Sequence, residues 1–162
     1  MKTILEILKE DHQKLITTMQ TLAECRGTGT PDDPVADLKA DSAMHTQLFN
    51  DFKQAFKSHD DAEENVFYPE LKQYPTLDSL VSKGVAAHHL VKVGIIELRV
   101  IPFHHETWPA KFAVVQDSIL SHMQEEETLL FPQVAALVSR ELLEAIGNKV
   151  LDSRAPKLTL KT

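Results

Sequence analysis

Cysteine is almost missing from this chain: Cys25 is the only one among 162 residues. One thiol cannot form an internal disulfide, and it cannot supply the set of thiolates that a cysteine-based zinc or iron–sulfur site needs. A metal bound by this protein would therefore need histidine and carboxylate ligands. The lack of disulfides is also typical of a protein from a reducing compartment.

Long apolar runs and basic clusters are lacking as well. No stretch is long and apolar enough to span a bilayer, and the N-terminal segment mixes charges with apolar residues at helical spacing, unlike a signal peptide. The formal net charge is −7, and no dense run of lysine and arginine offers a surface for nucleic-acid phosphates. We therefore expect a cytoplasmic protein that binds neither membranes nor nucleic acid.

Glycine is scarce, with five residues, while the hydrophobic share of 43% is ordinary for a globular chain. A chain of this length buries roughly 70% of its unfolded surface, enough for a core that does not depend on a metal or a disulfide. We expect one domain over residues 1–152, followed by a poorly ordered tail over residues 153–162.

Apolar residues recur at steps of three and four along most of the chain, which predicts amphipathic helices and no strands. Asp33 is the predicted N-cap of the second helix. The predicted helices run from Ile4 to Leu22, from Pro34 towards Tyr68, from Thr76 or Asp78 to Ile101, from about Trp108 to Leu130 and, as a short extra helix, from Ser139 to Leu151. Four long helices with short connections favour an all-α, up-down-up-down four-helix bundle with a short extra C-terminal helix.

One motif occurs twice: His59-x3-Glu63 returns as His122-x3-Glu126, and each copy ends in an aromatic residue followed by proline. On a helix, side chains four residues apart lie one above the other on the same face. Each pair can therefore present an imidazole and a carboxylate to one metal centre. Two such pairs indicate two metals.

The other two long helices also carry a histidine on their apolar stripes. Apolar residues follow His12 at offsets of three, seven and ten, and they follow His88 at the same offsets, so both side chains are predicted to point inward. The adjacent His89 remains an alternative to His88. The predicted stripe of the third helix also includes Val85.

The candidate ligands are four imidazoles and two carboxylates: His12, His59, Glu63, His88, His122 and Glu126. Nitrogen and oxygen ligands without thiolate suit iron or manganese, whereas zinc usually has four ligands. If carboxylates bridge two ions, positions remain open on each ion for a small molecule.

The segments HDDAEENVFYPEL at 59–71 and HMQEEETLLFP at 122–132, together with Asp11-His12 and His88-His89, resemble the hemerythrin-like, HHE cation-binding family over residues 1–135. The resemblance implies a four-helix bundle around two iron ions with an oxo, hydroxo or water bridge. It also implies terminal ligation by His12, His59, His88 and His122, and bridging by Glu63 and Glu126.

The sequence differs from that of the oxygen-carrying hemerythrins at two positions that bear on function. Lys92 stands four residues after His88, where oxygen-carrying hemerythrins have a second histidine, and Glu127 stands where they have an aspartate. We therefore expect a protein that binds O2, peroxide or NO for sensing, detoxification or iron handling, and not an oxygen carrier. A di-iron peroxidase or catalase-like enzyme, and a bundle that scaffolds a protein partner, are the alternatives.

Other polar residues near the motifs are not assigned as ligands. Glu64 and Glu127 lie about 100° round the helix from the predicted bridging carboxylates, so we expect them to face solvent or to accept the N–H of a ligand histidine. We expect Tyr68 at the rim of the site. His45 is expected to be packed and hydrogen-bonded away from the site, and residues 104–105 to be loop histidines.

Overall fold

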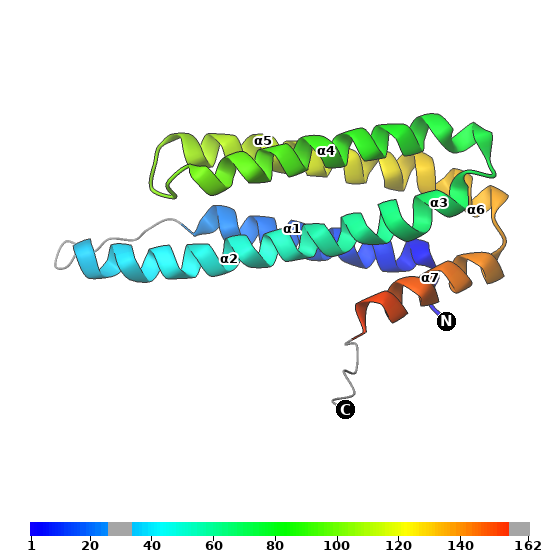
Figure 1. The fold of residues 1–162 in the computed structure, drawn as a ribbon, viewed down its shortest axis with the longest axis horizontal. Helices are drawn as coiled ribbons and strands as arrows, with labels where there is room; N and C mark the ends of the chain where they lie inside the picture. Colours follow the sequence, from blue (N-terminus) through cyan, green and yellow to red (C-terminus); the bar gives the residue numbers. More distant parts are fainter. Residues whose placement is uncertain (26–33, 156–162) are drawn as a thin grey trace, which may run out of the picture.

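The computed structural model describes residues 1–25 and 34–155, and these residues are almost entirely helical (Figure 1). The long helices are α1 (Ile4–Glu24), α2 (Pro34–Ala62), α4 (Asp78–Val100) and α5 (Thr107–Glu125), with α7 (Arg140–Arg154) after them. The short elements are η1 (Glu63–Phe67), α3 (Tyr68–Leu71), η2 (Pro75–Leu77), η3 (Glu126–Leu130) and α6 (Phe131–Leu137). Within the described ranges there is no strand, and no helix combines the length and apolarity needed to cross a membrane.

The four long helices form two antiparallel pairs. The α1/α2 pair and the α4/α5 pair lie one over the other, and α7 crosses the end of the bundle near the N-terminus (Figure 1). The predicted all-α bundle with an extra C-terminal helix is therefore confirmed. Because the connections between successive helices are short, each helix runs back along its predecessor.

Two predicted helix starts have different outcomes. The second long helix begins at Pro34, as predicted, and Asp33, its predicted cap, lies outside the described residues. The prediction that Thr76 or Asp78 caps the third helix is wrong, because the N-cap of α4 is Leu77, which makes no side-chain cap hydrogen bond. A 3₁₀ turn over residues 75–77 leads into this helix instead.

Proline changes the backbone hydrogen bonding of the helix at the same point of both motifs. Pro69 has no N–H to donate, and its ring crowds the carbonyl four residues back. The backbone responds with a π turn in which the N–H of Tyr68 reaches the carbonyl of Glu63, and the N–H of Phe131 reaches that of Glu126. The prolines therefore do not stop the helices, whose axes continue through α3 and α6, and each carboxylate begins a π segment.

The last helix is tied to the bundle at its end. It runs to Arg154, into the predicted tail of residues 153–162, and residues 156–162 lie outside the described part of the chain. The guanidinium of Arg154 donates to Asp11 at 3.1 and 2.5 Å and to the carbonyl of Ser58 at 3.0 Å. These bonds join α7 to α1 and α2.

Two apolar clusters fill the bundle, and the predicted ligands lie between them. Along α1, Leu8 belongs to one cluster and Leu15 to the other, with His12 between them. On α2, Phe56 and Ala62 belong to different clusters in the same way and flank His59. The centre of the bundle is therefore a polar layer enclosed on both sides by apolar side chains.

Candidate metal centre

The six predicted ligands meet in this polar layer. They are His12 from α1, His59 from α2, Glu63 at the start of η1, His88 from α4, His122 from α5 and Glu126 at the start of η3. All six are buried, and the most exposed of them, His122, is 6% exposed. Their convergence was predicted from helical spacing together with the repeated His-x3-Glu motif.

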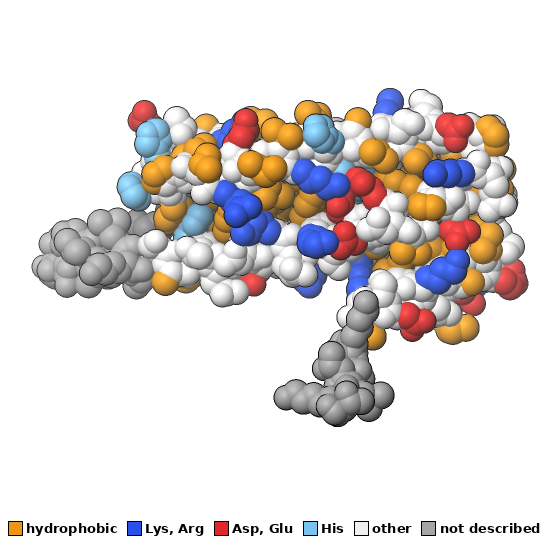
Figure 2. Space-filling view, in the orientation of Figure 1, with side chains coloured by type: hydrophobic (Ala, Val, Ile, Leu, Met, Phe, Trp, Pro, Cys, Tyr) orange, Lys and Arg blue, Asp and Glu red, His pale blue; other side chains and the backbone are white. Residues whose placement is uncertain are grey.

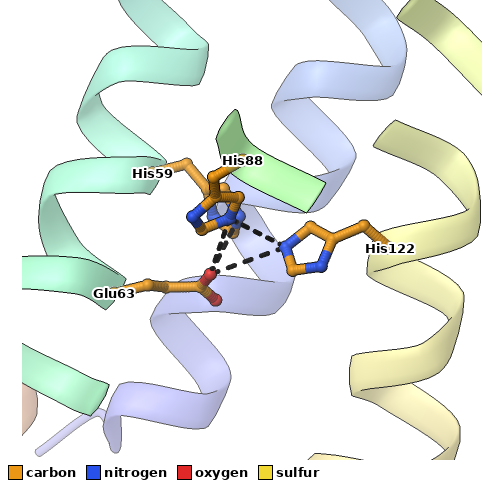
Figure 3. A group of neighbouring side chains, drawn as sticks. All are labelled: His59, Glu63, His88 and His122. Carbon is orange, nitrogen blue, oxygen red and sulfur yellow. Dashed lines mark hydrogen bonds and ion pairs between the residues drawn. The ribbon is translucent and has the colours of Figure 1, made fainter. Parts of the chain in front are cut away.

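Two overlapping groups of potential ligands occur here. One contains His59, Glu63, His88 and His122 (Figure 3), and the other contains His12, His59, Glu63 and Glu126. In each group, one ligand atom from every residue lies within 4.8 Å of the others. Because His59 and Glu63 belong to both groups, the carboxylate of Glu63 lies between two neighbouring ligand sets.

The imidazoles turn their Nε2 atoms towards carboxylate oxygens at a spacing that suits a bound ion. His12 Nε2 lies 3.3 Å from Glu126 Oε2. His59 Nε2 and His88 Nε2 lie 3.4 and 3.2 Å from Glu63 Oε2. Charge-assisted hydrogen bonds are shorter, about 2.7–2.9 Å. Two ligands on one metal, at bond lengths of about 2.1 Å, lie roughly 3.0–3.4 Å apart.

Unpartnered polar atoms are concentrated at the same place. Among the described residues, buried side-chain atoms without a hydrogen-bond partner include His12 Nε2, both ring nitrogens of His59, Glu63 Oε1 and Glu126 Oε2. Each such atom costs about 1–3 kcal/mol when nothing compensates for its lost hydration. A cation bound by the Nε2 atoms and carboxylate oxygens in this set would compensate, because lone pairs of imidazole and carboxylate are the donors that it requires.

A comparison with protein-family models decides the family. Residues 3–134 match the hemerythrin HHE cation-binding domain. This chain belongs to that family. The match covers both motifs and all six clustered residues of the HHE domain, and no curated protein and no solved structure matched the chain.

The two central carboxylates of this HHE domain have opposite pKa shifts. Burial raises the pKa of Glu126, and the nearby carboxylate of Glu63 raises it further. Burial acts on Glu63 in the same direction, but the surrounding imidazoles outweigh it and hold its pKa well below the ordinary value. Burial also lowers the pKa of His59 to about 3, so this imidazole is neutral and has a lone pair to donate.

Further carboxylates contact the Nδ1 atoms of two imidazoles, on the side of each ring that faces away from the central carboxylates. His12 Nδ1 lies 2.6 Å from Glu127 Oε1, and His88 Nδ1 lies 3.1 Å from Glu64 Oε1. Of the two expectations for Glu64 and Glu127, facing solvent or contacting one of the predicted ligand histidines, the structure shows the contact. Asp60, which the sequence did not single out, also lies 3.1 Å from His88 Nδ1. Such contacts orient an imidazole and make its other nitrogen a stronger donor.

These contacts change the proton affinity of His88. Burial opposes its protonation, but the nearby carboxylates of Asp60 and Glu63 outweigh burial and raise the pKa of His88 to about 10. His88 is fully buried, whereas its neighbour His89 is exposed. The apolar offsets shared with His12 therefore identified the inward histidine of α4 correctly.

Tyr68 is buried at the centre of the site. It is 3% exposed, and its hydroxyl lies 2.9 Å from Glu63 Oε2 and 2.8 Å from Glu126 Oε1. The prediction that it lies at the rim is wrong, because the π turn brings the residue five positions on beside Glu63. Burial and the two carboxylates raise the pKa of Tyr68, so its phenol remains a proton donor.

A glycine makes room for this tyrosine. A Cβ atom at Gly84 would lie 2.5 Å from the hydroxyl oxygen of Tyr68 and 3.5 Å from Cε1 of His122. The inward position is therefore occupied by Gly84, and the expectation that Val85 faces inward is wrong, because Val85 is 42% exposed. The apolar spacing of α4 did not reveal this close approach.

The remaining histidines lie outside the centre. His45 is packed against aromatic rings, with centroid distances of 3.4 Å to Phe103 and 4.5 Å to Trp108. Its packing was predicted, but its Nε2 has no hydrogen-bond partner within the described chain. Burial lowers the pKa of His45 to about 4. Residues 104–105 are exposed in the connection between α4 and α5, as predicted.

His45 makes the metal-free protein sensitive to acid. Between pH 6.5 and about 4, the unfolded chain binds a proton at His45 that the folded chain does not, so the free energy of unfolding falls as pH falls through this window. His45→Phe retains a ring and removes the proton site. We expect its loss of stability between pH 7 and pH 5 to be about 1 kcal/mol smaller than that of the unsubstituted protein.

Urea unfolding of both metal-free proteins at pH 7 and pH 5 measures this difference. His105→Phe, at an exposed loop position, is the control and should show the full decline. Equal losses of stability in the His45 variant and the unsubstituted protein would show that His45 does not resist protonation.

Proposed function

We propose that this HHE domain binds two neighbouring iron ions and offers open coordination positions to a small ligand, O2, NO or peroxide, in sensing, detoxification or iron handling. Glu63 is the residue on which the proposal depends, because its carboxylate belongs to both groups of potential ligands. The family itself is one of cation-binding domains. Nitrogen and oxygen ligands without thiolate suit iron.

The ring distances support two imidazoles for each ion. The rings of His12 and His59 are 5.0 Å apart and those of His88 and His122 are 4.5 Å apart, whereas His59 lies 5.7 and 6.1 Å from the second pair. Glu63 and Glu126 each have an oxygen close to imidazoles of both pairs, so they would bridge the two ions. Each ion would then have four protein donors, which would leave an octahedral ion with open positions for a small ligand.

The surrounding side chains keep this centre dry. The ring of Phe131 stacks on His12 at a centroid distance of 5.8 Å, and Phe56 meets His88 edge-on at 5.9 Å. These rings exclude water from the histidines that they cover. Iron, when bound, would supply the ligand-binding and redox chemistry, and the rigid helices hold the donors in place.

A second function, peroxide turnover, is favoured by Tyr68. Reduction of peroxide needs a proton near the bound oxygen atoms. The hydroxyl of Tyr68 contacts both central carboxylates, and its raised pKa keeps the proton on the phenol at neutral pH. Tyr68 can therefore hold a proton beside the centre or orient the two carboxylates.

Metal analysis tests the proposal. After expression with added iron, we expect about two equivalents of iron per chain, and fewer in His88→Ala. His89→Ala is the matched control, because the adjacent side chain is exposed and should leave the metal content unchanged. Less than about 0.2 equivalents of any transition metal in the unsubstituted protein would contradict the proposal and favour a scaffold for a protein partner.

The same iron-loaded protein distinguishes the roles. Its absorption spectrum would be recorded under anaerobic conditions and again after adding NO, O2 or peroxide. A change on addition would demonstrate open coordination positions on the iron. Catalytic consumption of peroxide would support the enzymatic function, whereas binding without turnover would support sensing or iron handling. A spectrum that responds to none of these ligands would contradict the open positions.

A further inference from the structure

Asp60, Glu64 and Lys92 converge on the side of His88 that faces away from Glu63. Lys92 Nζ lies 2.8 Å from Asp60 Oδ1 and 3.1 Å from Glu64 Oε1. The same two oxygens each lie 3.1 Å from His88 Nδ1. Basic and acidic side chains accordingly meet on the surface between α2 and α4 in Figure 2. These contacts form a continuous series from the exposed side chain of Lys92, through the two carboxylates, to the imidazole of His88.

The two carboxylates would separate without a cation. Asp60 and Glu64 are four residues apart, and like charges at this spacing repel each other. Lys92 reaches them from another helix, α4, and brings one oxygen of each to the same point beside His88. The Lys92 side chain is 40% exposed, and exposed ion pairs contribute little to folding stability. Its clearest physical effect is on where the carboxylates lie.

The other imidazoles lack this arrangement. His12 Nδ1 contacts Glu127, but within the described part of the chain no ion pair joins Glu127 to a lysine or arginine. Neither ring nitrogen of His59 has a hydrogen-bond partner among the described residues. A surface lysine therefore acts on only one side of the centre.

We propose that Lys92 is a positioning residue for His88. By holding Asp60 and Glu64 together, it keeps the Nδ1–H of His88 donating to Glu64 Oε1, with the negative charge of Asp60 Oδ1 beside the same nitrogen, which fixes the ring and makes Nε2 a stronger donor to metal. This inference rests on the proposed function, since it requires an ion at Nε2. The metal position formed by His88 and His122 then depends on Lys92, and the position formed by His12 and His59 does not.

Titration of the metal-free chain with Fe²⁺ in the absence of oxygen tests this role. In Lys92→Met we expect one of the two binding steps to weaken by roughly 10–100-fold, the usual effect of losing an outer hydrogen-bond partner of a ligand, and the other step to be unchanged. Lys92→Arg retains a cation at the same place and should restore most of the affinity. The melting temperature of the metal-free variants should stay close to that of the unsubstituted protein.

Lys57→Met is the matched control. Lys57 forms an ion pair with Asp61 at 2.5 Å on the same helix as Asp60, so its loss removes a comparable surface contact that does not lead to His88. Two unaltered binding steps in Lys92→Met would overturn the inference, as would equal weakening of both steps. Absence of Fe²⁺ binding by the unsubstituted protein would instead overturn the proposed function, and this inference with it.

Discussion

Glu63→Gln is expected to abolish metal binding at both positions, with the affinity for Fe²⁺ reduced by more than about 100-fold, beyond the effect of losing an outer partner of a ligand. The reason is that Glu63 belongs to both ligand groups and its Oε2 lies within 3.2–3.7 Å of the Nε2 atoms of His59, His88 and His122. An amide has the shape of the carboxylate but not its charge, and it cannot bridge two cations equally well. Metal analysis and Fe²⁺ titration measure the loss.

Glu125→Gln is the control for this substitution. Glu125 forms an ion pair with Lys83 at 2.9 Å on the surface, beside Glu126 but outside the ligand groups. We expect this variant to retain both ions. Circular dichroism would show that the Glu63 variant remains helical, and a helical Glu63→Gln protein that still binds two ions would contradict the bridging role.

Acidification is expected to release the metal steeply. Metal binding requires a free lone pair on each Nε2, and protons compete for it. In the metal-free protein, burial opposes protonation of His88 and His12, but nearby carboxylates outweigh it, raising the pKa of His88 to about 10 and also raising the pKa of His12. His88 therefore loses a proton when metal binds at neutral pH, and the affinity should fall by about 10-fold for each unit that pH is lowered. Below pH 6.5 His12 also carries a proton that metal must displace, so the affinity should fall by about 100-fold per unit there.

Dialysis against buffers from pH 8 to pH 4, followed by metal analysis, follows this release. His59 should contribute nothing to the slope in this range, because burial already lowers its pKa to about 3. Loss of metal also removes its contribution to stability, so the melting temperature should fall together with the metal content. Iron retained at about two equivalents after long dialysis at pH 4 would contradict a centre built on histidine.

Much of the fold and the convergence of the six side chains could be predicted from the sequence. The spacing of apolar residues by three and four defines which face of each helix is buried, and a histidine on that face has to point into the bundle. This reasoning found His12 and His88 without any motif. The repeated His-x3-Glu pattern then located the remaining four, because residues four apart on a helix share a face.

Other features depended on backbone geometry that α-helical spacing does not describe. Tyr68 was misplaced because the turn after Glu63 is a π turn, which Pro69 favours by withholding an N–H. Gly84 was overlooked because its importance comes from the hydroxyl of Tyr68, which belongs to a different helix. Neither feature leaves a periodic signal within one segment.

The sequence by itself determined the helices, the inward faces and the set of nitrogen and oxygen donors, because these follow from interactions between residues close together along the chain. The tertiary structure alone decided which carboxylate faces which imidazole. Asp60 and Lys92 meet at His88 only because α2 and α4 lie beside each other there. Contacts between helices depend on how the helices are placed, and helical periodicity carries no information about that placement.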